Sequence, residues 1–328
     1  MEQIRSPMAA RRIGAEGRTV VIHAEAGWHR LISDAKIDFF AKLSERLTIE
    51  GVPSRVALAG GQTSKVLLAQ DHLHIMVGMQ PAYGPNILHA HPSYIWGFWY
   101  LDEIGYHWNS SLRMAQFLPE RIDAEKARYF FDGMTGWMLR NNLSLTQQEA
   151  REEAGLAPAA AVIYCQEVEN ATDRCHFLTT EDMLRTTAET YPDRLVYVKM
   201  HPNQTKPMRQ KIIAICQDYP NFRLTTASVH DLNAASDIVV THNSAAGFEA
   251  LMQRKPVITC ARSDFWHATL TPRNQADLRE ALRHGAAAMA GFDYVKFLYW
   301  FLARKCLEPQ KAEFASRAWA RIRDKAYL

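Results

Sequence analysis

The chain alternates between short β-branched apolar runs and longer segments whose apolar residues recur at helical spacing. Residues 18–25 read as a strand with a polar end, and residues 37–50 as an amphipathic helix that Gly51 terminates. Residues 56–59 and 74–77 resemble further short strands. This β-α-β alternation predicts a parallel sheet in the first part of the chain.

The second half repeats the alternation more cleanly. The predicted strands are 160–165, 194–199, 222–225, 237–241 and 256–259, and the predicted helices are 180–190, 206–217, 229–235 and 244–253. This is the pattern of a doubly wound sheet. Ligands of such sheets bind outside the carboxyl ends of the strands, so the residues directly after each strand are the functional candidates.

Between the two halves the pattern becomes less regular. Residues 81–136 are rich in Trp and Tyr without a clear period, which predicts an irregular segment suited to a cleft wall. Residues 143–153 are polar and predicted helical. Gly155 and Pro158 interrupt that helix, so we place a domain boundary near residue 155.

Composition narrows the class of protein. Of 328 residues, 48% are hydrophobic and 22% charged, which is typical of globular domains, and the length favours two of them. A net charge of +3 is too small for a nucleic-acid-binding surface. Five scattered cysteines suggest free thiols in a reducing compartment, and no apolar run approaches the roughly 20 residues of a membrane span. We therefore expect a cytoplasmic protein.

The most informative strand end is the segment 237–251. Asn243 or Ser244 can cap the helix that follows, and Ala245 and its small neighbours allow close approach to the backbone. Backbone amides and the helix dipole would favour a phosphate there, with Glu249 within reach of ribose hydroxyls. A plain helix cap with a solvated Glu249 is the alternative interpretation.

Two further strand ends are polar. Gln166 ends the strand 160–165, and Lys199 precedes the dipeptide His201–Pro202. Proline keeps His201 out of helical geometry and would hold its imidazole at the edge of the sheet. A His-Pro dipeptide alone is a weak signal, but it gains weight beside the segment around Ser244.

The sequence Lys-Met-His-Pro at 199–202, followed by Thr-His-Asn-Ser-Ala-Ala-Gly-Phe-Glu-Ala-Leu at 241–251, resembles the bacterial capsule polysaccharide biosynthesis family, which includes Kdo transferases. The resemblance covers mainly residues 160–262. It implies a GT-B-like α/β fold, in which two Rossmann-like domains with parallel sheets face a central cleft. It also implies that His201, Ser244 and Glu249 contact the nucleotide of a CMP-linked donor, with Gln166 at a further family position.

Under this interpretation, residues 1–155 form an acceptor-side domain and residues 156–290 a nucleotide-sugar-binding domain. Residues 291–328 form helices that pack back on the first domain. Sugar transfer requires a carboxylate as base or nucleophile, and the candidates are Asp102, Glu103 and Asp132. Each of them could equally be a surface acid in a loop.

The resulting hypothesis is an enzyme, a glycosyltransferase that moves Kdo or a similar sugar from a nucleotide-sugar donor to a capsular polysaccharide or glycolipid acceptor. It needs no cofactor and no metal, because helix-end amides and basic residues can offset the phosphate charge. A nucleotide-sugar epimerase and a non-catalytic carbohydrate-binding or assembly subunit are the alternatives. The aromatic and basic residues of 295–304 are explained better by ordinary helix packing than by an interfacial contact, although a peripheral contact with the inner membrane or with other capsule-assembly proteins stays open.

Overall fold

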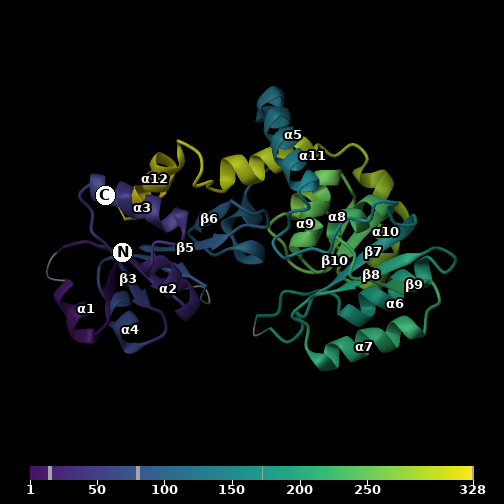
Figure 1. Ribbon diagram of the computed structural model, residues 1–328, viewed down its shortest axis with the longest axis horizontal. Coiled ribbons are helices and arrows are strands. Elements are labelled where there is room, and N and C mark those ends of the chain that lie inside the picture. The colour runs from purple at the N-terminus through teal and green to yellow at the C-terminus, as the bar shows by residue number, and fades with distance from the viewer. Residues whose placement is uncertain (14–16, 79–81, 172, 327–328) are drawn as a thin grey trace. The chain divides into compact units, whose positions relative to one another are not determined.

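The computed structural model describes all residues except 14–16, 79–81, 172, 327 and 328. The chain forms two compact units, Met1–Ser111 with Leu302–Leu328, and Leu112–Phe301 (Figure 1). The sequence placed the boundary near residue 155 instead. The difference arises because α5 (Ala124–Arg140) packs on α11 (Tyr294–Leu298), which belongs to the second unit.

The first unit contains a six-stranded sheet in the order β1-β3-β2-β4-β5-β6. The strands are β1 Glu2–Ile4, β2 Val20–Ala24, β3 Ser54–Leu58, β4 Leu73–Val77, β5 Ile87–Pro92 and β6 Trp99–Asp102. All neighbours pair in parallel except β5 and β6, which are antiparallel. The three predicted strands correspond to β2, β3 and β4.

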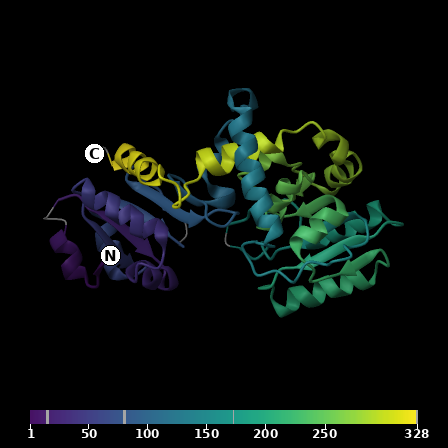
Figure 2. The ribbon, with the colours of Figure 1, turned by 45° about the horizontal axis from the view of Figure 1, so that its top comes forward.

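Helices cover both faces of this sheet. Residues of α2 (Ala26–Ser33), α3 (Asp38–Ile49) and α12 (Phe314–Ala326) share one hydrophobic core with β2, whereas α1 (Pro7–Ile13) and α4 (Gln62–Leu68) pack on the other face. Figure 2 shows α12 lying along α3, far from it in sequence. Of the C-terminal segment 291–328, residues 302–328 belong to the first unit and 291–301 to the second.

The second unit contains a parallel five-stranded sheet in the order β11-β10-β7-β8-β9. Its strands are β7 Ala159–Cys165, β8 Val196–Met200, β9 Phe222–Leu224, β10 Ser236–Thr241 and β11 Val257–Thr259. On one face lie α6 (Thr180–Thr190), α7 (Lys206–Gln217) and α10 (Gln275–Met289). On the other lie α8 (Val229–Ala235) and α9 (Ala245–Ala250), which a short 3₁₀ turn, Leu251–Gln253, extends. The predicted α/β class with two parallel-dominated sheets is confirmed.

Two predictions about the intervening region were wrong. Residues 81–136 are not irregular throughout, because they contain β5, β6 and most of α5, whose N-cap Asp123 accepts hydrogen bonds from the amides of Glu125 and Lys126. Residues 143–153 are not helical. Their polar groups bond instead to α8 and α9, so tertiary contacts outweigh the local helical pattern.

Candidate functional site

Three predicted strand-end residues lie level with one another in the second sheet. In the parallel register Cys165 is opposite Met200, and Tyr164 is opposite Thr241. Gln166 and His201 therefore follow aligned positions on β7 and β8, and Asn243 follows β10 at the height of Gln166. In this sheet β8 lies on one side of β7 and β10 lies on the other. The carboxyl ends of these strands are therefore the switch point of the sheet, where ligands of doubly wound folds bind.

Gln166 joins the ends of β7 and β10. Its Oε1 accepts hydrogen bonds from the Asn243 amide at 2.9 Å and from the Thr241 hydroxyl at 3.3 Å. The Asn243 side chain in turn donates to the carbonyl of Arg262 at 2.9 Å. Gln166, Asn243 and Ser244 are half-buried, so they form a fixed polar rim that still reaches the surface.

Of the two predicted capping residues, Ser244 is the one that caps α9. Its hydroxyl accepts a hydrogen bond from the Ala246 amide at 3.2 Å, and its own amide donates to the Thr241 hydroxyl at 3.4 Å. The amides at the start of α9 are thus already in contact with protein oxygens, although these bonds are long. If a phosphate bound beside Ala245, the amides of this loop would exchange their long hydrogen bonds to protein oxygens for charge-assisted bonds to the phosphate.

His201 has a defined tautomer. Its Nδ1 accepts a hydrogen bond from the Asn203 amide at 3.1 Å, so the proton of the neutral ring is on Nε2. Burial lowers the pKa of His201, which keeps the ring neutral near pH 7. The backbone amide of His201 donates to the buried side chain of Gln204 at 3.0 Å, which fixes the turn. His201 can therefore donate one hydrogen bond to an oxygen of a ligand.

The ammonium group of Lys199 is bound by three protein oxygens, and its predicted contact with a nucleotide stays a prediction. Its Nζ donates to the carbonyls of Ala227 and Thr226 at 2.6 and 3.3 Å and to Gln148 Oε1 at 3.0 Å. Burial lowers its pKa, while the nearby carboxyl groups of Glu149 and Glu249 act in the opposite direction. The ammonium group acts here as a link between the sheet and residue 148.

Glu249 is fully buried under residues 144 and 145. Its Oε1 accepts hydrogen bonds from the Ser144 hydroxyl at 2.7 Å and from the Leu145 amide at 3.4 Å, and Oε2 has no partner among the described residues. Burial raises the pKa of Glu249 to about 8, against the effect of these hydrogen bonds. Because Glu249 is fully buried, a ligand hydroxyl could reach its carboxyl group only after neighbouring residues had moved.

The sequence did not indicate the contacts of the segment 142–152, which we call the covering segment. Arg151 pairs with the nearly buried carboxylate of Asp231, which also accepts from the Glu152 amide at 2.9 Å. His230 Nε2 donates to the Leu143 carbonyl at 2.7 Å. Only the polarity of the segment and of α8 could have hinted at this docking.

The three predicted catalytic acids occupy different environments. Asp102 is buried, and its oxygens accept hydrogen bonds from the amides of residues 104, 105 and 111 and from the Ser111 hydroxyl, an arrangement that holds a loop in place. Glu103 is exposed and lies 3.5 Å from Lys325 Nζ. Asp132 lies on the exposed face of α5, in the second unit. The structure does not bring Asp132 together with the other two in one unit, and their catalytic role stays a prediction.

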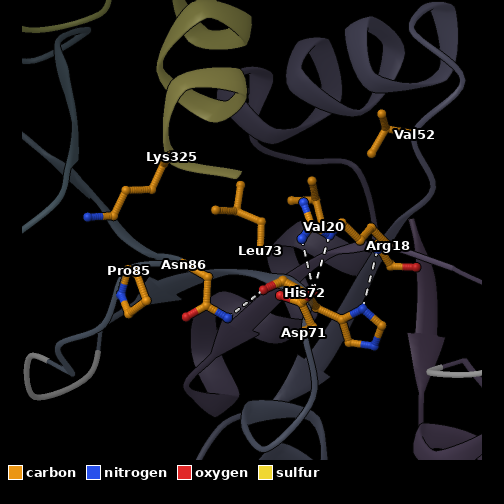
Figure 3. A pocket seen from close by; sticks show the side chains of 10 residues that line it. Arg18, Val20, Val52, Asp71, His72, Leu73, Pro85, Asn86 and Lys325 are labelled. Atoms are coloured by element: carbon orange, nitrogen blue, oxygen red, sulfur yellow. Dashed lines mark hydrogen bonds and ion pairs between the residues drawn. The ribbon is translucent and has the colours of Figure 1, made fainter. Parts of the chain in front are cut away.

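A cavity of about 290 Å³ lies in the first unit, beside the N-terminal ends of β2 and β4 (Figure 3). Arg18 and Asp71 pair at 2.9 Å on its rim, and Asn86 donates to the His72 carbonyl at 2.7 Å. Most of its polar groups therefore bond to one another. Parallel sheets bind substrates at the carboxyl ends of their strands, whereas this cavity lies at the N-terminal ends.

Over the residues that the structure describes, no helix has both the length and the apolar character needed to cross a bilayer. In the same residues, no three or more His, Cys, Asp or Glu side chains form a group that could hold a metal ion.

Part of the chain is similar to a known family of proteins. The fold defines a GT-B-like α/β protein, and residues 167–297 match the family described as capsule polysaccharide biosynthesis protein. The resemblance carried by His201 and by residues 241–251 is thereby confirmed.

Solved structures extend the similarity of fold over most of the chain. A KpsC beta Kdo 2,4 transferase from Thermosulfurimonas dismutans has 14% sequence identity and a TM-score of 0.52, covering 82% of this chain and 90% of that one. The KpsC beta Kdo 2,7 transferase of the same organism has 15% identity and a TM-score of 0.51, covering 80% and 89%. Comparison with curated proteins gave no match.

Proposed function

We propose that this protein is a glycosyltransferase of capsule polysaccharide biosynthesis, which transfers Kdo or a related sugar from a CMP-linked donor to a saccharide or glycolipid acceptor. One observation carries the proposal. Gln166, His201 and Asn243 lie level at the switch point of the second sheet, and His201 and Asn243 fall inside the segment that matches the capsule family.

The chemistry of these groups suits a nucleotide. The Nε2 of His201 can donate to a phosphate or ribose oxygen, and the loop at Ser244 and Ala245 can receive the phosphate by exchanging its long internal bonds. Glu249 would accept hydrogen bonds from ribose hydroxyls if the covering segment moved aside. Neither step needs a metal, so we propose that the enzyme requires no cofactor besides its two substrates.

Nucleotide binding is tested by thermal unfolding with CMP, UDP, GDP and ADP. A ligand at 100 times its dissociation constant stabilises the folded state by about 2.7 kcal/mol. We expect a shift with CMP that His201→Ala and Asn243→Ala reduce and that His284→Ala, an exposed residue of α10, leaves unchanged. A response to another nucleotide alone would contradict the CMP donor.

Transfer itself is tested with CMP-Kdo and acceptor saccharides, by measuring release of CMP. The proposal requires release that depends on the acceptor. Sugar release at the same rate without an acceptor, or nucleotide binding without any turnover, would favour an epimerase or a binding subunit instead.

A further inference from the structure

Two of the residues predicted to bind the nucleotide, Lys199 and Glu249, already have partners in the covering segment. Ser144 donates a hydrogen bond to Oε1 of Glu249 at 2.7 Å. Gln148 Oε1 accepts a hydrogen bond from Nζ of Lys199 at 3.0 Å. All four residues lie within the second unit, so both contacts belong to that unit alone.

The covering segment presents to these two residues the groups that a nucleotide would present. The Ser144 hydroxyl donates to the Glu249 carboxyl group, as a ribose hydroxyl would. Gln148 Oε1 accepts from the Lys199 ammonium group and also from the backbone amide of Val229 at 3.1 Å. A carbonyl oxygen of a nucleobase, or a phosphate oxygen, could accept the same two bonds. A nucleotide that bound both side chains would therefore have to replace both contacts.

The hydrogen-bonding capacity of Lys199 is full. Its ammonium group has three N–H donors. The carbonyls of Thr226 and Ala227 and Oε1 of Gln148 accept from it at 3.3, 2.6 and 3.0 Å. The two carbonyls belong to the backbone directly ahead of α8, whereas Gln148 contributes a side chain with rotatable bonds. Of the three acceptors, Gln148 is therefore the one that a ligand can replace.

The covering segment is anchored at its two ends. Asn142 accepts a hydrogen bond from the Ser228 hydroxyl at 2.6 Å, and Arg151 pairs with Asp231. Between these anchors lie residues 143–150, all of them described by the structure and none of them buried. Polar contacts can be exchanged for contacts with water or a ligand at little net loss, whereas the exposure of buried apolar side chains is costly. The middle of the segment can therefore leave while its ends stay attached.

We propose that the covering segment is autoinhibitory, with Gln148 and Ser144 in the places of nucleotide atoms until a donor displaces them, an inference that rests on the proposed glycosyltransferase function. In the closed state Lys199 and Glu249 are engaged within the protein. A donor binds only those molecules in which residues 144–148 have moved, so its apparent affinity is reduced by the fraction of open molecules. Weakening the segment's contacts therefore tightens nucleotide binding, whereas the loss of a binding residue weakens it.

The test compares Gln148→Ala with Gln147→Ala in the full-length protein, by calorimetric titration with CMP. Gln147 is the exposed neighbour of Gln148 and forms no hydrogen bond with any described residue. A hydrogen bond to a charged group contributes a factor of about ten or more, so Gln148→Ala should lower the Kd for CMP about tenfold. Ser144→Ala breaks a bond between uncharged groups and should lower it about threefold. Gln147→Ala should bind CMP as the wild type does.

A second measurement follows the covering segment itself in the wild type. If CMP displaces residues 144–148, chymotrypsin should cleave after Leu145 faster with saturating CMP than without it. Equal or slower cleavage would show that the nucleotide binds while the segment stays closed, and this overturns the proposal. If Gln148→Ala does not fold, Ser144→Ala and this measurement decide the question.

The outcomes separate autoinhibition from the donor site. A Kd for CMP that is unchanged or raised in Gln148→Ala overturns the autoinhibition and leaves the donor site intact, because the nucleotide still binds. If neither the wild type nor Gln148→Ala binds CMP, UDP, GDP or ADP, the proposed donor site fails and the autoinhibition fails with it. Binding of CMP by Gln148→Ala alone would support both.

Discussion

The hydroxyl of Ser144 donates a 2.7 Å hydrogen bond to Oε1 of Glu249, a residue 105 positions later in the chain. The other carboxyl oxygen, Oε2, is buried without a partner in the described structure. A single hydroxyl and a distant amide do not offset the loss of water around a charged carboxylate. Glu249 is therefore kept protonated by its surroundings, with its pKa raised to about 8.

This burial predicts a specific pH dependence. Because the folded pKa of Glu249 lies above the unfolded value of about 4.3, its contribution to stability is complete below that value. The contribution is lost as the pH rises toward 8, at about 1.4 kcal/mol per unit. Glu249→Gln cannot ionise, so the variant should gain stability relative to the wild type between pH 5 and pH 8.

Urea unfolding of both proteins across this range measures the difference. Glu280→Gln, an exposed glutamate of α10, serves as the control and should follow the wild type at every pH. Parallel curves for Glu249→Gln and the wild type would show that Glu249 is ionised in the folded state.

The covering segment depends on Asp231. This carboxylate is only 6% exposed and pairs with Arg151 and the Glu152 amide, whereas Asp237, which pairs with Arg194, is 62% exposed. Because Arg151 is itself 39% exposed, removing the charge of Asp231 leaves no buried charge behind, but it weakens two charge-assisted hydrogen bonds of about 1.5–3 kcal/mol each, whereas an exposed pair contributes roughly 0–1 kcal/mol.

Asp231→Asn should therefore release residues 142–152, and protease cleavage there should accelerate at least tenfold. Asp237→Asn should cleave at the wild-type rate. Equal rates for both variants would mean that the other contacts suffice to hold the segment.

Three buried side chains in the first unit form a hydrogen-bonded row. Ser64 Oγ lies 2.7 Å from His23 Nδ1, His23 Nε2 lies 3.0 Å from His74 Nδ1, and His74 Nε2 lies 3.3 Å from the Gln70 carbonyl. The carbonyl can only accept, so His74 donates to it, His23 donates to His74, and Ser64 donates to His23. Burial is the main reason that the pKa falls to about 3 for His23 and to about 4 for His74.

The folded pKa values lie below the unfolded value of about 6.5, so this stabilisation is complete above pH 6.5 and is lost as the pH falls toward 4. The nearby His72 opposes protonation of both rings, and Asp71 favours it at His74. Hydrogen exchange of the first unit should show a steep loss of protection over this range. His74→Asn should reduce the steepness, and His284→Asn should not.

Gly78 and Gly133 predict opposite responses to alanine. At Gly78 the positive φ costs a non-glycine residue about 1–3 kcal/mol, and the contact with Trp28 adds to this. Gly133 lies within α5 with open space around its Cβ position, so alanine should stabilise the helix by about 0.5–1 kcal/mol. Thermal unfolding of the two variants should shift in opposite directions. A raised midpoint for Gly78→Ala would disprove the close packing at this residue.

The sequence predicted the second unit well, because its buried parallel strands are continuous apolar runs and its helices begin at clear caps such as Thr179 and Ser228. The prediction from sequence failed where a histidine occupies a buried position in a strand. His89 lies fully buried in β5, yet it reads as polar and conceals the strand. Burial of such residues depends on partners distant in the sequence, which no local pattern reports.

The candidate site was also only partly predictable from the sequence. Gln166, His201 and Ser244 could be predicted, because each follows a recognisable strand of a fold with a known binding edge. The burial of Glu249 could not be predicted, because it depends on the contact between Ser144 and α9.

The first unit draws on both ends of the chain. Phe314, Ala318 and Ile322 of α12 enter its core, and Arg321 donates to the carbonyls of Leu101 and Lys305. During synthesis on the ribosome, residues 112–301 can complete their unit while residues 1–111 still lack this helix. Residues 1–111 are therefore synthesised before residues 112–301 but reach their final packing only after α12 has been made, and a premature stop codon before residue 302 would leave them without this part of their core.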